Sequence, residues 1–170
     1  ALESPWRSLK LLTDRTEFGE NIKIEILSVS QDELLQDFED TTDITETGLY
    51  RKVYTDEFGQ FGGDPYGVIL GNYSISPSAS DMSLLSYMSS LSAMTHAPFV
   101  SSASESFFGL DDFSELPNLK QLEALFEGPQ YTKWRAFRRS DDSRNVGLTL
   151  PKFMLRPTYG ENIPVTGFNY

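Results

Sequence analysis

One apolar run limits the possible folds of this chain more than any other segment. It covers residues 66–73 and reads YGVILGNY, without the polar alternation of a half-exposed strand. Such a run is typical of a strand that is covered on both faces, as in a parallel sheet. A helix-length apolar pattern follows at residues 81–96, and the short run APFVSS at residues 97–102 predicts a second strand. A strand, a helix and a strand in this order predict a right-handed βαβ unit.

The rest of the chain extends this pattern. Residues 21–29, NIKIEILSV, alternate isoleucines with charged residues and predict a strand with one buried face. Ser30 and Glu33 have the spacing of a capping box, which opens a helix that runs to about residue 40. Residues 146–150 predict a fourth strand, which Pro151 ends. Further helices are predicted at residues 2–13, 46–58, 118–126 and 131–139.

Together these elements predict an α/β fold with a mixed or mostly parallel central sheet flanked by helices. A length of 170 residues fits a single domain, residues 1–170. Pro and Gly residues interrupt the end of the chain, so residues 157–170 are predicted to form an irregular tail. Because the chain opens with Ala1 and ends on this turn-rich tail, we expect it to be a piece of a longer protein.

Charge is distributed unevenly along the chain. The net charge is −11, and residues 1–64 hold six Lys/Arg against fifteen Asp/Glu. Residues 133–156 hold seven Lys/Arg against two Asp/Glu and form the basic part. Such asymmetry favours electrostatic association with a charged partner or with a second copy, head to tail. The alternative is that both charged surfaces are simply solvated.

The residue types that are missing exclude several kinds of site. The chain has no cysteine, which excludes a disulfide framework and a thiol nucleophile and agrees with a reducing compartment. No apolar run approaches the ~20 residues that a membrane-spanning helix needs, and no signal peptide is recognisable. We therefore expect no membrane insertion.

Metal and phosphate sites are not favoured either. His96 is the only histidine, and no carboxylates are grouped around it, so a position at the end of a helix is the simpler interpretation. The glycine-rich stretch at residues 58–67 precedes a strand, whereas phosphate-binding loops follow a strand and open a helix. We therefore predict a turn at this stretch, no metal site and no cofactor.

Two pairs of adjacent aspartates are the strongest sign of an enzyme. Asp111–Asp112 and Asp141–Asp142 could serve a hydrolase or carbohydrate-active enzyme if two carboxyl groups lay close together in a pocket. Asp111–Asp112 precedes a turn, where acids commonly cap a helix. Asp141–Asp142 follows Arg138–Arg139, which favours local ion pairing. The sequence therefore favours a protein without catalytic residues, and a hydrolase is the alternative.

The basic stretch is also rich in aromatic residues. Cations beside aromatic rings could form a nucleic-acid surface, but the net charge of −11 opposes phosphate binding. Trp, Tyr and Arg are enriched at the centres of protein–protein interfaces, which favours a protein contact. Another interpretation is that the apolar half of the stretch belongs to the core. The candidate contact residues are Trp134, Arg135, Arg138, Arg139 and Arg144.

Four stretches of the chain resemble a single protein family. They are DRTEFGENIKIEILSVSQDELLQD (14–37), FGGDPYGVILGNY (61–73), THAPFVSSASESFFGLDDFSELP (95–117) and SDDSRNVGLTLPKFMLRPTYG (140–160), followed by VTGFNY. In this order they are similar to the large subunit of the type VI secretion contractile sheath. Members of that family are much longer, so the resemblance implies an internal section that lacks both ends.

The resemblance implies a structural role. Sheath large subunits pair with a small sheath subunit of the TssB/VipA type, and the pairs stack with further copies into a cytoplasmic tube related to phage tail sheaths. The tube surrounds an inner tube protein, stands on a baseplate and contracts, and a ring-shaped ATPase then disassembles it. No nucleic acid, cofactor or membrane is implied. The chain-end strands that join neighbouring subunits, and the helix that the ATPase reads, are not recognisable in this sequence.

Overall fold

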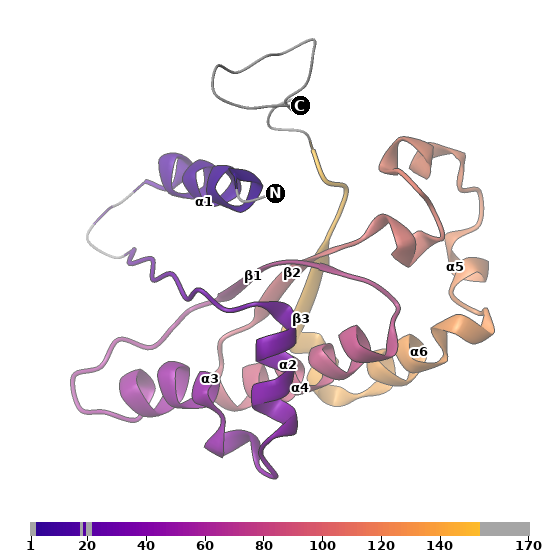
Figure 1. The fold of residues 1–170 in the computed structure, drawn as a ribbon. Helices are drawn as coiled ribbons and strands as arrows, with labels where there is room; N and C mark the ends of the chain where they lie inside the picture. Colours follow the sequence, from indigo (N-terminus) through magenta and orange to yellow (C-terminus); the bar gives the residue numbers. More distant parts are fainter. Residues whose placement is uncertain (1–2, 18, 20–21, 154–170) are drawn as a thin grey trace, which may run out of the picture. The chain divides into compact units, whose positions relative to one another are not determined.

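The computed structural model describes residues 3–17, 19 and 22–153 (Figure 1). The chain divides into two units, Ala1–Leu27 with Lys152–Tyr170, and Ser28–Pro151. The second unit contains the sheet. The irregular tail predicted at residues 157–170 lies outside the described residues.

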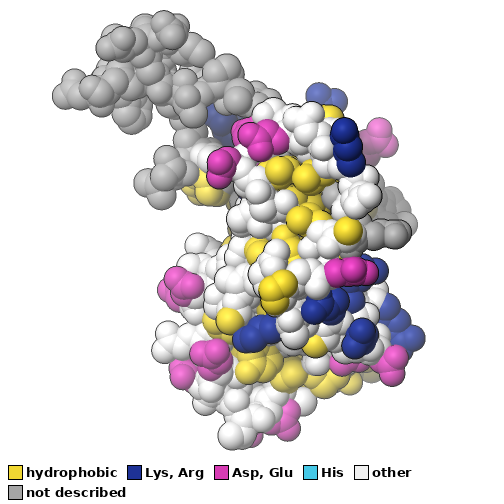
Figure 2. Space-filling model, turned by 90° about the vertical axis from the view of Figure 1, so that its right-hand side faces the viewer, with side chains coloured by type: hydrophobic (Ala, Val, Ile, Leu, Met, Phe, Trp, Pro, Cys, Tyr) yellow, Lys and Arg dark blue, Asp and Glu magenta, His cyan; other side chains and the backbone are white. Residues whose placement is uncertain are grey.

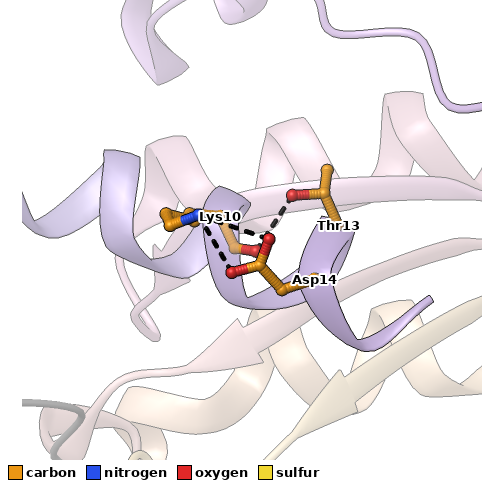
Figure 3. Close-up of polar contacts among 3 residues, drawn as sticks. All are labelled: Lys10, Thr13 and Asp14. Atoms are coloured by element: carbon orange, nitrogen blue, oxygen red, sulfur yellow. Dashed lines mark hydrogen bonds and ion pairs between the residues drawn. The ribbon is translucent and has the colours of Figure 1, made fainter.

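Helix α1, Glu3–Arg15, belongs to the first unit and confirms the helix predicted at residues 2–13. Lys10 Nζ lies 3.0 Å from Asp14 Oδ2, one turn later on the helix surface (Figure 3). Thr13 Oγ1 donates a hydrogen bond of 2.9 Å to the carbonyl oxygen of Lys10. The Lys10 and Asp14 side chains are largely exposed, so the ion pair adds only about 0.3 kcal/mol to helix stability.

The strand predicted at residues 21–29 is not formed in the described part of this segment, residues 22–29. The backbone there is irregular, although Lys23 Nζ and Glu25 Oε1 lie 2.7 Å apart. A strand needs hydrogen bonds from a neighbour, and none of the described strands pairs with this segment. Its exposed apolar side chains, between 47% and 60% accessible, are Ile22, Ile26 and Leu27.

The sheet of the second unit has three parallel strands in the order β1-β2-β3. The strands are β1 (Ile69–Ile75), β2 (Phe99–Ala103) and β3 (Val146–Thr149). In register, Ile69 lies opposite Phe99, and Phe99 lies opposite Val146. The parallel α/β sheet and three of the four predicted strands are therefore confirmed.

Strand β1 is irregular at its centre, where serine side chains of β2 donate hydrogen bonds to its backbone carbonyl groups. Leu70 pairs with Val100 but Ser74 pairs with Ser102, so β1 holds two more residues than β2 between these pairs. Ser101 Oγ donates to the carbonyl oxygens of Gly71 and Tyr73, and each donor–acceptor distance is 3.0 Å. A Cβ at Gly71 would lie 2.6 Å from the Phe99 ring, so this close approach requires glycine.

Helix α4, Ala79–Thr95, covers one face of the sheet and is the centre of the core. It begins at Ser78, whose side chain accepts a hydrogen bond from Asp81 N over 3.2 Å. The buried residues of this layer include Leu84, Leu85, Met88 and Leu91 from the helix, and Phe99 and Ala103 from the sheet. The prediction that β1 is covered on both faces differs from the structure, because Leu70 is 52% exposed. Within the described part of this unit, helices cover the sheet on the α4 face.

Residues between 31 and 58 form a second helical region. Helix α2 (Gln31–Glu39) packs on α4 through a stacked contact of Phe38 with Tyr87, whose ring centroids are 5.1 Å apart. The Asp37 carboxylate accepts hydrogen bonds from Gly48 N (3.0 Å) and Leu49 N (3.2 Å). The helix predicted at residues 46–58 appears as three short pieces: η1 (Ile44–Glu46), α3 (Gly48–Tyr50) and the π-helix η2 (Arg51–Phe58).

The capping box of α2 makes the stability of this helix depend on pH. Ser30 N donates to Glu33 Oε2 over 2.8 Å, and Glu33 N donates to Ser30 Oγ over 3.2 Å. The backbone N–H and the hydroxyl of Ser30 both donate to the Glu33 carboxylate, which favours its ionised form and lowers the pKa of Glu33 below its ordinary value of 4.5. Because the folded pKa is depressed, the contribution to stability is present above pH 4.5 and is lost as the pH falls through the folded pKa.

We expect Glu33→Gln to lower the urea midpoint of unfolding at about pH 7, and we expect the difference from the wild type to shrink at about pH 3.5. Urea denaturation followed by circular dichroism measures both values. In a Ser30→Ala background the same substitution should have a smaller effect, because the carboxylate has lost the Ser30 hydroxyl and keeps only the backbone N–H as a donor. An equal difference at the two pH values would contradict the role of the carboxylate in the cap.

Helix α4 ends at His96, which confirms the predicted helix-terminal position. His96 has a left-handed backbone conformation (φ 57°, ψ 19°), and its ring centroid lies 6.4 Å from that of Phe58. A residue with a side chain in this conformation is strained by about 1–2 kcal/mol, whereas glycine is not.

We therefore expect His96→Gly to raise the free energy of unfolding by about 1 kcal/mol. His96→Ala keeps the strain and loses the ring, so it should be neutral or destabilising. Thermal unfolding of the two variants distinguishes them. A lower melting temperature for His96→Gly than for the wild type would mean that the contact with Phe58 outweighs the strain.

The remainder of the second unit consists of short helices. They are η3 (Glu105–Phe108), η4 (Phe113–Asn118), α5 (Leu122–Leu125), η5 (Pro129–Tyr131), α6 (Thr132–Arg139) and η6 (Asp141–Asn145). The helix predicted at residues 131–139 is confirmed by α6, but the one predicted at residues 118–126 is reduced to the single turn of α5.

Candidate protein-contact surface

An aromatic cluster around Phe107 holds α6 in place. Phe107 is 2% exposed, and its ring meets that of Trp134 edge to face with centroids 4.9 Å apart. Trp134 also stacks on Phe137 at 5.7 Å. Tyr131 Oη donates a hydrogen bond of 2.9 Å to the Phe107 carbonyl oxygen, and burial raises the pKa of Tyr131. The first candidate contact residue, Trp134, is therefore a half-buried part of this cluster.

The Arg135 guanidinium forms hydrogen bonds within the second unit. Its Nη1 donates to the carbonyl oxygens of Phe126 (2.8 Å) and Gly128 (2.9 Å). Its Nη2 donates to Thr132 Oγ1 over 3.3 Å. These bonds satisfy carbonyl groups just beyond α5, where a helix end leaves acceptors without partners. Arg135 therefore fixes the turn between α5 and α6.

The other three candidate residues are exposed cations. Arg138 and Arg139 occupy the last turn of α6, where the helix dipole favours positive charge, and Arg144 follows in η6. Lys133, which is also on α6, is a fourth exposed cation. We call these four residues the basic surface; none of them forms an ion pair with another described residue. Figure 2 shows Lys and Arg side chains gathered with hydrophobic ones on the lower part of one face.

The sequence suggested that Asp141 and Asp142 pair with Arg138 and Arg139, and this is wrong. No such ion pair is present in the described residues. Asp142 instead accepts a hydrogen bond of 3.1 Å from Ser90 Oγ of α4. Ser140 ends α6 with an extended backbone (φ −72°, ψ 144°), and η6 then returns against α4. Asp142 therefore anchors the segment that carries Arg144.

A groove of about 440 Å³ lies between α4 and α6. Its lining consists of Met82, Ser83, Ser86, Ser89, Ser90, Lys133, Ala136, Phe137, Ser140 and Asp142. The serine hydroxyls are already engaged: Ser86 Oγ, for example, donates to the Met82 carbonyl oxygen, and Ser140 Oγ to that of Phe137. Because these donors point at the helices themselves, the groove offers few converging polar groups for a small ligand.

The other candidates for chemistry have structural roles. Asp112 Oδ1 accepts a hydrogen bond of 2.7 Å from Ser114 N, which confirms the predicted cap. Hydrogen bonding by the side chain and then the backbone of Ser114 lowers the pKa of Asp112, whereas the general acid of a glycosidase needs a raised pKa. Gly62 has a positive φ of 85° and lies in a turn, as predicted for this stretch. Within the described ranges, no three His, Cys, Asp or Glu residues are grouped as metal ligands require.

None of the helices in the described ranges combines the length and the apolar character that crossing a membrane needs.

The structure adds an acidic feature that the sequence pattern located only broadly. Residues 31–46 hold seven Asp/Glu and no Lys/Arg. Three of these acids accept backbone hydrogen bonds: Glu33, Asp37 and Asp43. Four are exposed and have no partner among the described residues: Asp32, Glu39, Asp40 and Glu46. The signal that could have located them is a run of acids that continues past the end of a predicted helix.

Comparisons with known proteins agree with one another. Residues 1–170 match the VipB family model, described as the EvpB/VC_A0108 tail sheath N-terminal domain. The chain is also 42% identical over 173 residues to the type VI secretion system sheath protein TssC1 of Pseudomonas aeruginosa strain PAO1. This similarity covers 99% of the chain and 34% of the relative, so the chain spans about a third of that protein's length.

Proposed function

The chain belongs to the VipB family of tail sheath N-terminal domains, and from this we propose that it is a section of a structural subunit of a contractile type VI secretion sheath. The observation that carries the proposal is the 42% identity to a sheath protein across 99% of the chain. Since the similarity runs through the whole sequence, it extends beyond any single motif. The fold is then a member of the phage tail sheath group.

In the assembly we propose, the subunit pairs with a small sheath subunit of the TssB/VipA type and stacks with further copies into a cytoplasmic tube. The tube encloses an inner tube protein and stands on a baseplate, and a disassembly ATPase acts on it after contraction. The subunit contributes binding surfaces and no catalysis. The internal roles of Asp112, Asp142 and the groove serines support this, because the groups that could do chemistry already hold the fold together.

Contraction in this proposal needs no bound nucleotide. Subunits assemble in an extended lattice of higher free energy and relax into a tighter one by rigid-body movement at their interfaces. Interfaces of that kind need exposed, complementary groups on a rigid frame. The basic surface supports this requirement, because Arg138, Arg139 and Arg144 project from segments that the aromatic cluster and Asp142 fix in place.

The test is to express the full-length protein with and without its small partner subunit and to examine both samples by electron microscopy. Long hollow tubes that form only with the partner are the expected result. Monodisperse particles under both conditions would overturn the sheath proposal. They would leave an α/β protein whose function lies elsewhere.

A further inference from the structure

The helical layer of the second unit carries opposite charges on two segments that pack against the same helix. Helix α2 is attached to α4 by the Phe38–Tyr87 stack and by a hydrogen bond of 2.7 Å from Gln31 Nε2 to Asp81 Oδ1. Segment η6 is attached to α4 by the bond from Ser90 to Asp142. Both segments therefore lie against α4. Figure 1 shows α2 and α6, the helix that precedes η6, beside α4.

The basic side of this layer is rigid and available. Arg138 lies over the Trp134 ring, with Cζ 5.9 Å from the ring centroid, and Trp134 is itself held by Phe107 and Phe137. The guanidinium groups that remain exposed have no ion-pair partner among the described residues. A charge that is fixed in this way loses little side-chain entropy when it binds an opposite charge.

The acidic side lies on and just beyond α2, which packs against the same helix α4. We call Asp32, Glu39, Asp40 and Glu46 the acidic surface. Glu39 is in the last turn of α2 and Asp40 is its C-cap, where the helix dipole disfavours negative charge. Two exposed acids at a helix C-terminus reduce the stability of the isolated subunit. Their placement is explained if a cation from another molecule binds them.

These observations lead to an inference that rests on the proposed sheath function. We propose that the basic surface of one subunit binds the acidic surface of a second copy of the same protein, head to tail. In the tubular assembly proposed above, each subunit offers its basic surface to one neighbour and its acidic surface to another, so the contact is heterologous. Because it joins unlike surfaces, it leaves one free surface of each kind at the ends of any chain of subunits and propagates as a ring or a helical array.

A symmetric contact centred on either surface does not fit the same charges, because a two-fold axis through the basic surface would place four exposed cations opposite four others. Like charges placed opposite each other are strongly unfavourable at an interface. Within one subunit the two surfaces are not joined by any ion pair of the described residues, so their charges are not neutralised internally. A head-to-tail contact satisfies both surfaces at once.

The experiment exchanges the charges of the two surfaces in the full-length protein, expressed with its small partner. Variant one is Glu39→Lys with Asp40→Lys, variant two is Arg138→Glu with Arg139→Glu, and variant three carries all four substitutions. We expect variants one and two each to reduce the sedimentable tube fraction by about tenfold or more. We expect variant three to recover to within about twofold of the wild type, because the four exchanged side chains again face opposite charges.

A matched control reverses two other exposed acids, Asp111→Lys with Glu115→Lys, which should leave assembly unchanged. Failure of variant three to recover, or normal tubes from variant one, would overturn the head-to-tail contact. If the acidic partner were the small subunit instead, variant one should form normal tubes and variant three should not recover. That outcome would also overturn the inference. Absence of tubes from the wild type would overturn the sheath proposal itself and is distinguishable from these results.

Discussion

Phe107→Ala is expected to lower the free energy of unfolding of the second unit by about 3–5 kcal/mol. The ring is 2% exposed and contacts the rings of Trp134, Phe126 and Tyr131. Its removal loses the transfer free energy of a buried aromatic side chain and leaves a cavity that short helices on three sides cannot close without moving. Since small domains are stable by only about 5–15 kcal/mol, this is a large fraction of the total.

The measurement is urea denaturation of the wild type and the variant, followed by tryptophan fluorescence because Trp134 contacts the deleted ring. Phe61→Ala is the matched control: the same side chain is removed from a fully exposed position, 110% accessible, and the change should stay within about 0.5 kcal/mol. A loss below about 1 kcal/mol for Phe107→Ala would mean that the cluster does not hold α6 in place.

The elements that the sequence predicts well are those whose signal is local. Strand β2 and helix α4 follow directly from a short apolar run and a long apolar pattern, and their order requires a parallel crossover. The start of α2 follows from Ser30 and Glu33, three residues apart, because a capping box needs no distant partner. These predictions succeed because the physical cause lies within a few residues.

The failures have causes that lie elsewhere in the chain. Residues 21–29 show a clear strand alternation, yet strand pairing depends on a neighbour that the segment does not encode. The helix of residues 51–58 widens to a π-helix, whose last turn includes a bond of 2.7 Å from Gly59 N to the Tyr54 carbonyl oxygen. Its residues fit the α-helical period as well as the wider one, so periodicity does not separate the two.

The candidate surface shows the same limit. Five residues of one basic and aromatic stretch are alike in the sequence, but the structure turns Trp134 and Arg135 toward their own unit. That difference depends on the carbonyl groups of Phe126 and Gly128, which become acceptors only after the turn beyond α5 has formed. The sequence could therefore locate a basic region but not the arginines that remain exposed in it.

Arg138→Glu with Arg139→Glu in the full-length protein is expected to shorten or abolish sheath tubes while the subunit stays folded. Each reversal at the end of α6 costs about 0.3–1 kcal/mol through the helix dipole, which is small against the total stability. The loss of the Arg138–Trp134 contact adds about 0.5–1 kcal/mol. At an interface the same reversal replaces attraction by repulsion and should reduce tube length by about tenfold or more.

The control for this experiment is Arg51→Glu with Lys52→Glu, which changes the charge equally at two exposed cations of η2. If net charge alone governed assembly, both pairs would shorten the tubes to the same extent, and the basic surface would have no special role. If the contact is electrostatic, wild-type assembly should also weaken as salt rises from about 0.1 M to 1 M, where the screening length falls from about 10 to 3 Å. Normal tubes from the Arg138/Arg139 variant would place the contact on another surface, since a reversed pair cannot bind the same acidic partner.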